Sequence, residues 1–398
     1  MATKKNVLYL RSDLVLPKTG GSVAHTKGIL GALKKKGYKI YFACADIFEG
    51  LFDKNYILIP GKFFRYLFYG VGSFVYNYFG YLIFRLNKNK YKFDYVYTRY
   101  SLYSDLPVRV AKLFKIPLIL EYNGSEVWVA RNWHIRIFSY KVAEIMEKRC
   151  LDAASLIIVV SNALRDDLIL RGVSTKKILV SENGVDIDEY DVRKLNKKKR
   201  KKITNEYRIG SKKVIGFIGT FGLWHGTTEI VEAAKILVEK YRDVIFLMVG
   251  DGVTAKKVIK LIKAYELEKY FVLTGQVHQE DGKYYVSLFD IALNPTVPNE
   301  DGTEFIGSPT KIFEYLSLER PLVTSNVGQM GKIFSNKENA ILYDPSDRYG
   351  LSRSIEILLR DEKLRKKIAK NGRKLVKEKY SWDKNIERME KFMKINKI

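Results

Sequence analysis

The sequence predicts an α/β protein built from two doubly wound, mostly parallel sheets. Short runs rich in β-branched and aromatic residues alternate with longer stretches of helical periodicity, which is typical of β-α-β units. The chain has 398 residues, enough for two domains of ordinary size, and 46% of them are hydrophobic, so each domain can bury a core. A basic run at residues 194–202 separates two such series of strands and helices.

The first series contains six expected strands. They begin at Val7, Tyr38, Tyr95, Pro117, Leu156 and Ile178. Between them, the segment from Tyr66 to Phe84 carries no charge and is long enough to be considered as a membrane span, but five tyrosines and three glycines make it poorly lipophilic. We expect a buried or half-buried helix of the first domain there rather than a span, and a helix lying among lipid headgroups is the alternative.

The second series contains six more expected strands, and only helical patterns follow it. These strands begin at Val214, Val244, Phe271, Asp290, Pro321 and Ala340. In open parallel sheets, ligands bind beyond the carboxyl ends of the strands. We therefore expect a ligand cleft where the two sheets face each other.

The net charge of +26 indicates a polyanionic partner, which can be a nucleic acid, an anionic membrane surface or a phosphorylated substrate. Nucleic acid is the weakest of these, because the lysines are spread through both domains and no recognition motif occurs. Cys44 and Cys150 lie in apolar runs without metal-ligand spacing, and the first strand is not preceded by a signal-peptide pattern. We expect a cytoplasmic protein without a bound metal ion.

Glycine-rich turns follow three of the expected strands. Gly20 and Gly21 precede a helix after the first strand, and residues 219–230 and 249–254 repeat the order of strand, turn and helix start in the second domain. Bare backbone N–H groups at a helix N-terminus bind anions, so three such turns favour a ligand that carries phosphate. His225 lies where one of these helices begins, and an ordinary surface histidine is the alternative there.

A turn and a lysine stand at the start of an expected helix near Pro309. Ser308 suits the N-cap and Pro309 the first turn, while Lys311 and Glu314 share one face. A solvated ion pair between the last two is the simplest interpretation. Beside glycine turns, however, the ammonium and the helix dipole would attract a diphosphate, and the carboxylate would accept hydrogen bonds from ribose hydroxyls. A nucleotide is the ligand that satisfies both.

These motifs resemble those of the family 4 glycosyltransferases, which are retaining nucleotide-sugar enzymes of the GT-B fold. The similar segments read GGSVAHTKGILGALKKKGYKI, SENGVDIDEY, IGFIGTFGLWHGTTEIVEAA, LMVGDG and SPTKIFEYLSLERPLVTS, and together they span nearly the whole chain. The resemblance implies two Rossmann-like domains that face each other across a cleft. An acceptor-binding domain would occupy residues 1–190, joined by a C-terminal helix at 380–398, and a nucleotide-sugar donor domain would occupy 191–379.

The resemblance also implies roles for particular residues. The donor-binding residues would be Gly20, Gly21, Thr220, Gly222, Gly252, Val277, Ser308, Pro309, Thr310, Lys311 and Glu314. Within this set, Lys311 would bind the diphosphate and Glu314 the ribose. The catalytic residues would be Lys311, His225, Glu304 and Asn123.

The chain departs from the family pattern at three of these positions. Many members have a glutamate eight residues before the one at Glu314, but Ile306 stands there and the nearest upstream glutamate is Glu304. His225 stands in place of a lysine, and Asn123 lies where many members have a histidine. The first of these departures lies in the loop at residues 304–307, which would contact the donor sugar. The sequence of this loop therefore differs from the family pattern.

The resemblance implies a metal-independent hexosyltransferase that needs no cofactor besides its donor. It would move a sugar, with retention of configuration, from a nucleoside diphosphate sugar to an acceptor hydroxyl in polysaccharide, glycolipid or other glycoconjugate biosynthesis. The basic residues and the segment from Tyr66 to Phe84 favour a sugar or lipid-linked acceptor and the anionic inner face of the cell membrane as partners, and we expect a peripheral location there. Two alternatives stay open. One is a non-catalytic nucleotide-sugar-binding subunit of a transferase complex, and the other is a nucleotide-sugar epimerase or a phosphorylase that has the same fold.

Overall fold

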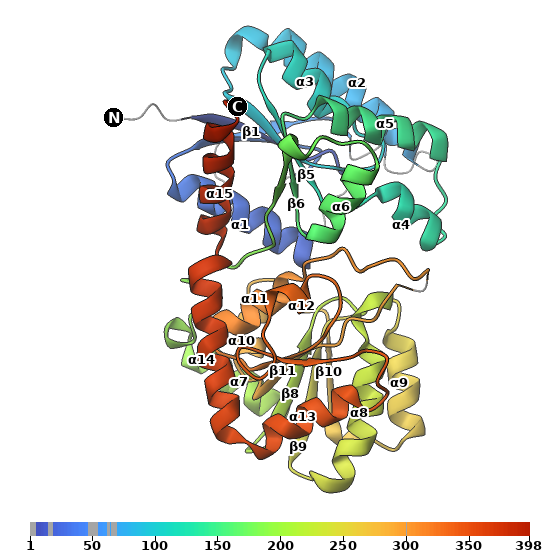
Figure 1. Cartoon of the computed structure of the whole chain (residues 1–398), viewed down its shortest axis with the longest axis vertical. Coiled ribbons are helices and arrows are strands. Elements are labelled where there is room, and N and C mark those ends of the chain that lie inside the picture. The colour runs from blue at the N-terminus through green and yellow to red at the C-terminus, as the bar shows by residue number, and fades with distance from the viewer. Residues whose placement is uncertain (1–4, 15–18, 47–54, 62–63, 65–69, 300) are drawn as a thin grey trace. The chain divides into compact units, whose positions relative to one another are not determined.

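The protein is described by a computed structural model that covers residues 5–14, 19–46, 55–61, 64, 70–299 and 301–398. Two compact units make up the chain (Figure 1). The described residues of Met1–Lys18, Thr26–Glu182 and Asn385–Ile398 form the first unit, and Thr19–His25 with Asn183–Lys384 form the second. The domain limits expected at 190/191 and 379/380 stay a prediction.

A sheet of seven parallel strands forms the centre of the first unit, in the order β3-β2-β1-β4-β5-β6-β7. Its strands are β1 (Asn6–Leu10), β2 (Lys39–Cys44), β3 (Tyr56–Leu58), β4 (Tyr95–Arg99), β5 (Leu118–Tyr122), β6 (Leu156–Val159) and β7 (Ile178–Val180). Six of them are the predicted ones. The edge strand β3 was not predicted, because three residues are too few to show a periodic pattern.

The helices of the first half of the chain follow the strands in alternation, as expected for β-α-β units. They are α1 (Gly21–Lys35), α2 (Val71–Leu86), α3 (Leu106–Phe114), α4 (Glu126–Asn132), α5 (Tyr140–Ala153) and α6 (Asn162–Leu170). Residues 66–69 of the segment expected to be a half-buried helix lie outside the described residues, and α2 forms the remainder. Tyr76 and Phe84 of α2 are buried, whereas Tyr78 and Phe79 are exposed. No helix in the described part of the chain combines the length and apolar character that a membrane crossing needs.

The last helix, α15 (Trp382–Ile395), brings the end of the chain into the first unit. Glu390 accepts a hydrogen bond of 2.6 Å from the Tyr38 hydroxyl, and Lys36 forms an ion pair of 3.4 Å with Glu387. Asn385 donates its side-chain amide to the carbonyl of Glu182 at 2.7 Å. The first unit thus includes a helix that follows the whole second series of strands in the sequence.

A second all-parallel sheet forms the centre of the second unit, in the order β10-β9-β8-β11-β12-β13. Its strands are β8 (Lys213–Ile218), β9 (Val244–Val249), β10 (Phe271–Gly275), β11 (Ile291–Asn294), β12 (Leu322–Ser325) and β13 (Ile341–Tyr343). All six correspond to the strands predicted for this half. The prediction of two parallel α/β sheets is therefore confirmed.

Helices cover both faces of the second sheet. They are α7 (Lys197–Glu206), α8 (Thr227–Lys240), α9 (Ala255–Ala264), α10 (Gly282–Val286), α11 (Thr310–Ser317), α12 (Met330–Ile333), α13 (Gly350–Arg360) and α14 (Glu362–Lys379). Strand β9 shows why both faces are covered: Leu247 packs into one hydrophobic cluster and its neighbour Phe246 into another, because successive side chains of a strand point to opposite faces.

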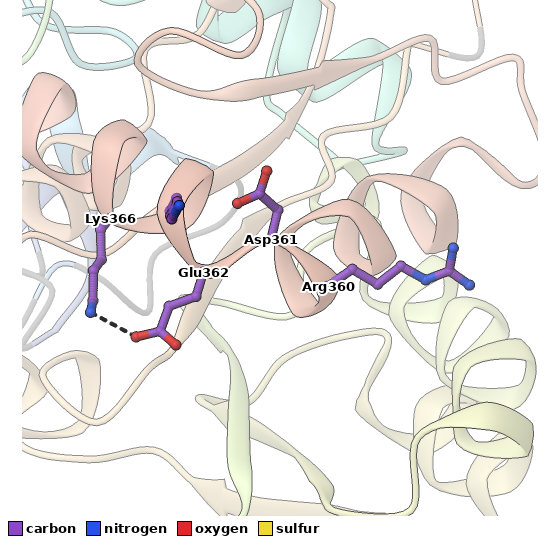
Figure 2. A pocket seen from close by; sticks show the side chains of 5 residues that line it. Arg360, Asp361, Glu362 and Lys366 are labelled. Atoms are coloured by element: carbon purple, nitrogen blue, oxygen red, sulfur yellow. Dashed lines mark ion pairs between the residues drawn. The ribbon is translucent and has the colours of Figure 1, made fainter.

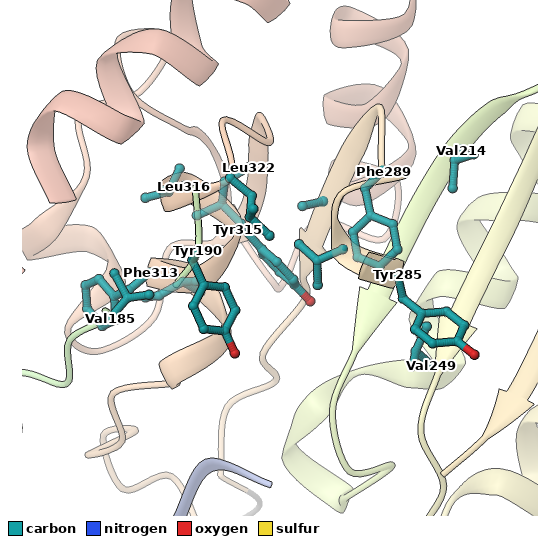
Figure 3. Close-up of a cluster of buried hydrophobic side chains, with 14 of the residues drawn as sticks. Val185, Tyr190, Val214, Val249, Tyr285, Phe289, Phe313, Tyr315, Leu316 and Leu322 are labelled. Atoms are coloured by element: carbon teal, nitrogen blue, oxygen red, sulfur yellow. The ribbon is translucent and has the colours of Figure 1, made fainter. Parts of the chain in front are cut away.

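One of these two clusters anchors helix α11 (Figure 3). Phe313, Tyr315 and Leu316 of α11 are fully buried in it. The Tyr315 hydroxyl also accepts a hydrogen bond of 2.9 Å from the backbone N–H of Ile218 at the end of β8. Helix α11 is therefore fixed against the carboxyl end of β8, and the loop that follows β8 begins next to this helix.

Candidate active site

Helix α11 begins one residue later than predicted. Its first residue is Thr310, Pro309 occupies the N-cap position, and Ser308 precedes it. Ser308 is buried, and its hydroxyl accepts a hydrogen bond of 3.2 Å from the backbone N–H of Asn183, whose side-chain amide also donates to the Ser308 carbonyl. The prediction of Ser308 as the N-cap is wrong, because this residue ties α11 to the chain segment at Asn183 instead of capping the helix.

Lys311 is a buried lysine without an acceptor. Its side chain is 6% exposed, and its Nζ atom has no hydrogen-bond partner among the described residues. The ammonium lies 4.0 Å from the centroid of the Phe217 ring, and a Cβ atom built on Gly219 would lie 3.4 Å from it. Burial lowers the pKa of Lys311 to about 7, against a smaller opposing effect of Glu314. The cation therefore lies beside the turn after β8 with its hydrogen-bond donors unused.

Glu314 lies one turn further along α11, but it does not form the ion pair that was the simple interpretation of the sequence. No ion pair within the described ranges joins Lys311 to Glu314. Burial raises the pKa of Glu314 to about 7, and a hydrogen bond from the Tyr190 side chain opposes this rise. As a residue, Glu314 is half-buried.

The turn after β8 contains His225, which ends the short 3-10 helix η6 (Leu223–His225). Its Nδ1 atom donates a hydrogen bond to the carbonyl of Thr220, so the second ring nitrogen, Nε2, is left for other contacts. Burial, with Lys311 as the next contribution, places the pKa of His225 well below its usual value. The ring packs edge-on against Phe217 at 5.9 Å between centroids. His225 and Lys311 therefore contact the same aromatic ring.

Glycines allow the backbone segments of this region to lie close together. Gly226, with φ of 57°, adopts the left-handed conformation immediately before α8, and a Cβ atom there would lie 1.9 Å from the Pro295 carbonyl oxygen. Gly250, after β9, would bring a Cβ atom within 1.9 Å of the Gly219 carbonyl oxygen. The predicted glycine turns of the second unit are thus packed against one another at the carboxyl ends of β8 and β9.

The remaining predicted donor-binding residues of the second unit lie on the same elements. Thr220 is exposed, Gly222 is buried and precedes η6, and Gly252 follows β9. Thr310 is the buried first residue of α11. Val277, after β10, packs against the cluster that anchors α11.

Other predicted site residues lie elsewhere. Glu304 is exposed and forms an ion pair of 3.7 Å with Lys332 of α12. Asn123 belongs to the first unit, where it donates a hydrogen bond of 2.7 Å to the buried Glu121. Gly20, with φ of 97°, and Gly21, the first residue of α1, belong to the second unit, and a Cβ atom on Gly21 would lie 3.3 Å from the hydroxyl oxygen of Thr310, so these two residues do lie beside α11.

Two residues of the site were not predicted. Phe217 supports both Lys311 and His225, and Tyr190 binds Glu314. Phe217 belongs to an apolar strand in which any large hydrophobic residue fits the pattern. Tyr190 ends an irregular polar segment without periodicity, so no sequence signal distinguished it.

A separate surface pocket lies where α13 meets α14, and the side chains around it are shown in Figure 2. It is lined by Arg360, Asp361, Glu362, Lys363 and Lys366. Lys366 and Glu362 form an ion pair of 2.7 Å at its edge. None of the predicted site residues lines this pocket.

The fold and site define the class of protein: two parallel α/β sheets, with glycine-rich turns against a lysine-bearing helix, are the architecture of GT-B glycosyltransferases. Residues 19–189 match the family described as Glycosyltransferase Family 4, and residues 198–375 match Glycosyl transferases group 1. The chain belongs to the family 4 glycosyltransferases.

Curated relatives are similar to this chain in sequence, and solved structures are similar to it in fold. The capsular polysaccharide biosynthesis glycosyltransferase CapM of Staphylococcus aureus is 27% identical over 62% of this chain and 63% of its own length, so the match leaves more than a third of CapM uncovered. The alpha-D-kanosaminyltransferase of Streptomyces kanamyceticus is 22% identical over 69% of each chain. A glycosyltransferase structure from Rickettsia africae has a TM-score of 0.73 at 20% identity over 99% of both chains. Anabaena HepE in complex with UDP-glucose has a TM-score of 0.72 at 15% identity, covering 98% of this chain and 99% of its own.

Proposed function

We propose that the protein transfers a sugar from a nucleoside diphosphate sugar to an acceptor hydroxyl, with retention of configuration. The donor domain would be residues 191–379, and the acceptor-binding domain would be residues 1–190 with the helix at 380–398. The reaction would be a metal-independent hexosyl transfer, and no cofactor besides the donor would take part. The structures of HepE with UDP and with UDP-glucose support a uridine nucleotide as the first donor to test.

The observation that carries this proposal is the buried ammonium of Lys311 beside the glycine turn after β8. A buried cation without an acceptor costs free energy, so such a group is expected where a ligand supplies the missing anion. A diphosphate at this turn would receive hydrogen bonds from Lys311 and from backbone N–H groups. The carboxylate of Glu314 would accept hydrogen bonds from the ribose hydroxyls.

The chemical step would need no protein nucleophile. The bond between the anomeric carbon and the diphosphate oxygen breaks, the acceptor oxygen bonds to the same carbon from the same face, and the acceptor proton passes to the departing diphosphate. Negative charge grows on the diphosphate as the bond breaks, so Lys311 binds the transition state more strongly than the ground state. The Nε2 atom of His225 would contact the same leaving group once the ring is protonated.

We also propose a sugar or lipid-linked acceptor and a cytoplasmic enzyme that is peripheral on the inner face of the cell membrane. The high positive charge favours an anionic lipid surface. The pathway would be polysaccharide, glycolipid or other glycoconjugate biosynthesis, and the similarity to CapM, which its name assigns to capsular polysaccharide biosynthesis, supports the first of these.

Thermal-shift measurements with uridine, guanosine and adenosine diphosphates, and then with their sugars, test the donor assignment. One nucleoside diphosphate should raise the melting temperature in wild type and much less in Lys311→Met. If no nucleotide shifts the melting temperature, the donor-site assignment is wrong.

A non-catalytic nucleotide-sugar-binding subunit is the second candidate. It is favoured by the exposed position of Glu304, paired with Lys332, and by Asn123 at the histidine-like place. An assay for release of free nucleoside diphosphate that depends on an added acceptor distinguishes the transferase, the binding subunit and the epimerase. A transferase releases it, whereas an epimerase returns an intact nucleotide sugar and a binding subunit leaves the donor unchanged.

A further inference from the structure

The connection between α4 and α5 in the first unit presents apolar and basic side chains together. Every residue from Arg131 to Phe138 is exposed except Ile137, which is half-buried. The large hydrophobic residues of this stretch are Trp133, Ile135 and Phe138, which are 39%, 47% and 59% exposed. Large apolar side chains gathered on one short surface segment mark an interaction site rather than a random surface.

The connection is held in a defined conformation. The Tyr103 hydroxyl donates a hydrogen bond of 3.0 Å to the Ser139 carbonyl and accepts one of 2.9 Å from the Ser139 backbone N–H. Ile137 packs against the small core cluster that contains Tyr103. These contacts hold Ile137 against the core while its neighbours remain exposed. The backbone of the connection is therefore fixed by the first unit itself, without a binding partner.

Helix α2 extends the apolar surface. The Phe138 ring meets the Phe74 ring of α2 edge-on, with 6.2 Å between centroids. Tyr78 lies one helical turn after Phe74 on the same face of α2 and is 61% exposed. The exposed aromatic residues therefore come from two elements that contact each other.

The charges beside this surface are mainly positive. Arg131 forms an ion pair of 2.6 Å with Glu144, but Arg136 and Lys141 have no ion pair with any described acidic residue. Tryptophan, tyrosine and phenylalanine with neighbouring arginine and lysine are the residues that favour the boundary between water and an anionic bilayer.

We propose that the surface formed by residues 131–138, Tyr78 and Lys141 is the membrane-docking surface of this protein, and that its partner is an anionic lipid bilayer. Apolar side chains would enter the headgroup layer, and Arg136 and Lys141 would lie against lipid phosphates. The inference rests on the proposed membrane location, and it places the contact mainly on the α4–α5 connection rather than on the uncharged segment that the sequence suggested.

Co-sedimentation of the full chain with vesicles tests the proposal. Wild type should bind phosphatidylcholine vesicles that contain phosphatidylglycerol and bind pure phosphatidylcholine vesicles weakly. The triple variant Trp133→Ser, Ile135→Ser, Phe138→Ser and the double variant Arg136→Glu, Lys141→Glu should each bind the anionic vesicles about tenfold less. Matched controls, Leu170→Ser with Ile395→Ser and Lys367→Glu with Lys370→Glu, change exposed residues elsewhere and should bind as wild type does.

A thermal shift with UDP on every variant separates the possible failures. An unchanged UDP shift shows that a variant is folded, so equal vesicle binding by such a variant and wild type would overturn the proposed surface. Wild type that shows a UDP shift but binds neither vesicle would overturn the membrane partner and leave the donor assignment intact. Dimerisation of wild type that the triple variant abolishes, without an effect on vesicle binding, would assign the surface to self-association instead.

Discussion

The ammonium of Lys311 lies 4.0 Å from the centre of the Phe217 ring instead of against a carboxylate. A ring face stabilises a cation but accepts none of its hydrogen bonds in the way an oxygen does. Lys311 is therefore kept in place while its N–H donors remain available. The same ring contacts His225, so one aromatic side chain positions both candidate groups for a diphosphate.

Replacing Lys311 by methionine should weaken UDP binding and leave the unliganded protein at least as stable as wild type. A hydrogen bond to a charged group contributes about 1.5–3 kcal/mol, so we expect the dissociation constant to rise about 10- to 150-fold. Stability should not fall, because the change removes a buried charge without a partner and keeps the side-chain volume. Isothermal titration and urea unfolding measure the two effects. The matched control is Lys332→Met, at an exposed lysine of the same unit, and equal UDP affinity in both variants would refute the role of Lys311.

UDP affinity should fall as pH rises above about 7. The pKa of Lys311 is lowered to about 7 by burial, so the free protein loses the required proton through this range. The pKa of His225 lies well below its usual value, so this ring is already neutral there and adds nothing to the change. Glu314, whose pKa is raised to about 7, ionises in the same interval. Binding of the anion raises the Lys311 pKa again, so the complex takes up a proton near pH 8. Titrations in two buffers of different ionisation enthalpy measure this uptake, and its persistence in Lys311→Met would contradict the assignment.

The same pKa values predict opposite effects of Lys311 and Glu314 on folding stability. The Lys311 pKa is lower in the folded state than the ordinary value of 10.5, so the unfolded chain binds more protons between about pH 7 and 10.5 and this group makes stability rise with pH there. The Glu314 pKa is raised from 4.5, so this group makes stability fall as pH rises from about 4.5 to 7. Comparison of wild type with Glu314→Gln across pH 4–7 isolates the second effect. A pH dependence that is identical in the two proteins would show that Glu314 has an ordinary pKa.

Glu314→Gln should weaken UDP binding but not the binding of inorganic pyrophosphate, because the ribose is the part of UDP that this carboxylate is proposed to contact. Lys311→Met should weaken both ligands. Competition of pyrophosphate with UDP gives the two affinities. Tyr190→Phe serves as the positioning control, since it removes the hydrogen bond to Glu314 and keeps the carboxylate. Equal losses of UDP and pyrophosphate in Glu314→Gln would place Glu314 at the diphosphate instead.

Gly216→Ala should destabilise the second unit. A Cβ atom at Gly216 would lie 2.1 Å from the Phe289 ring, and overpacking of a core costs about 1–3 kcal/mol. Gly31→Ala in α1 is the control, because no described atom outside the local helix backbone lies within 4 Å of the place its methyl group would take, and alanine favours helices. Urea unfolding should show a lower midpoint for the first variant only. Equal midpoints would mean that β8 shifts to accommodate the methyl group.

Much of the architecture could be predicted from sequence because buried parallel strands are continuous apolar runs separated by helical patterns. The three-residue strand β3 has no such pattern, and the N-cap was misplaced because a Ser-Pro pair also fits a helix that begins one residue later. Periodicity placed Lys311 and Glu314 on one face correctly, but by itself it left a solvated ion pair as the simplest interpretation of that face. Burial of Lys311 depends on Phe217, which is far away in sequence, and no local pattern contains that information.

The inclusion of residues 385–398 in the first unit affects the order in which the two units can fold during synthesis. Tyr38 and Lys36 find their partners Glu390 and Glu387 only after about 350 further residues have been synthesised. Domains generally fold in the order in which they leave the ribosome. Here residues 183–384 of the second unit emerge before those partners do, so the first unit is completed only after the second has been synthesised.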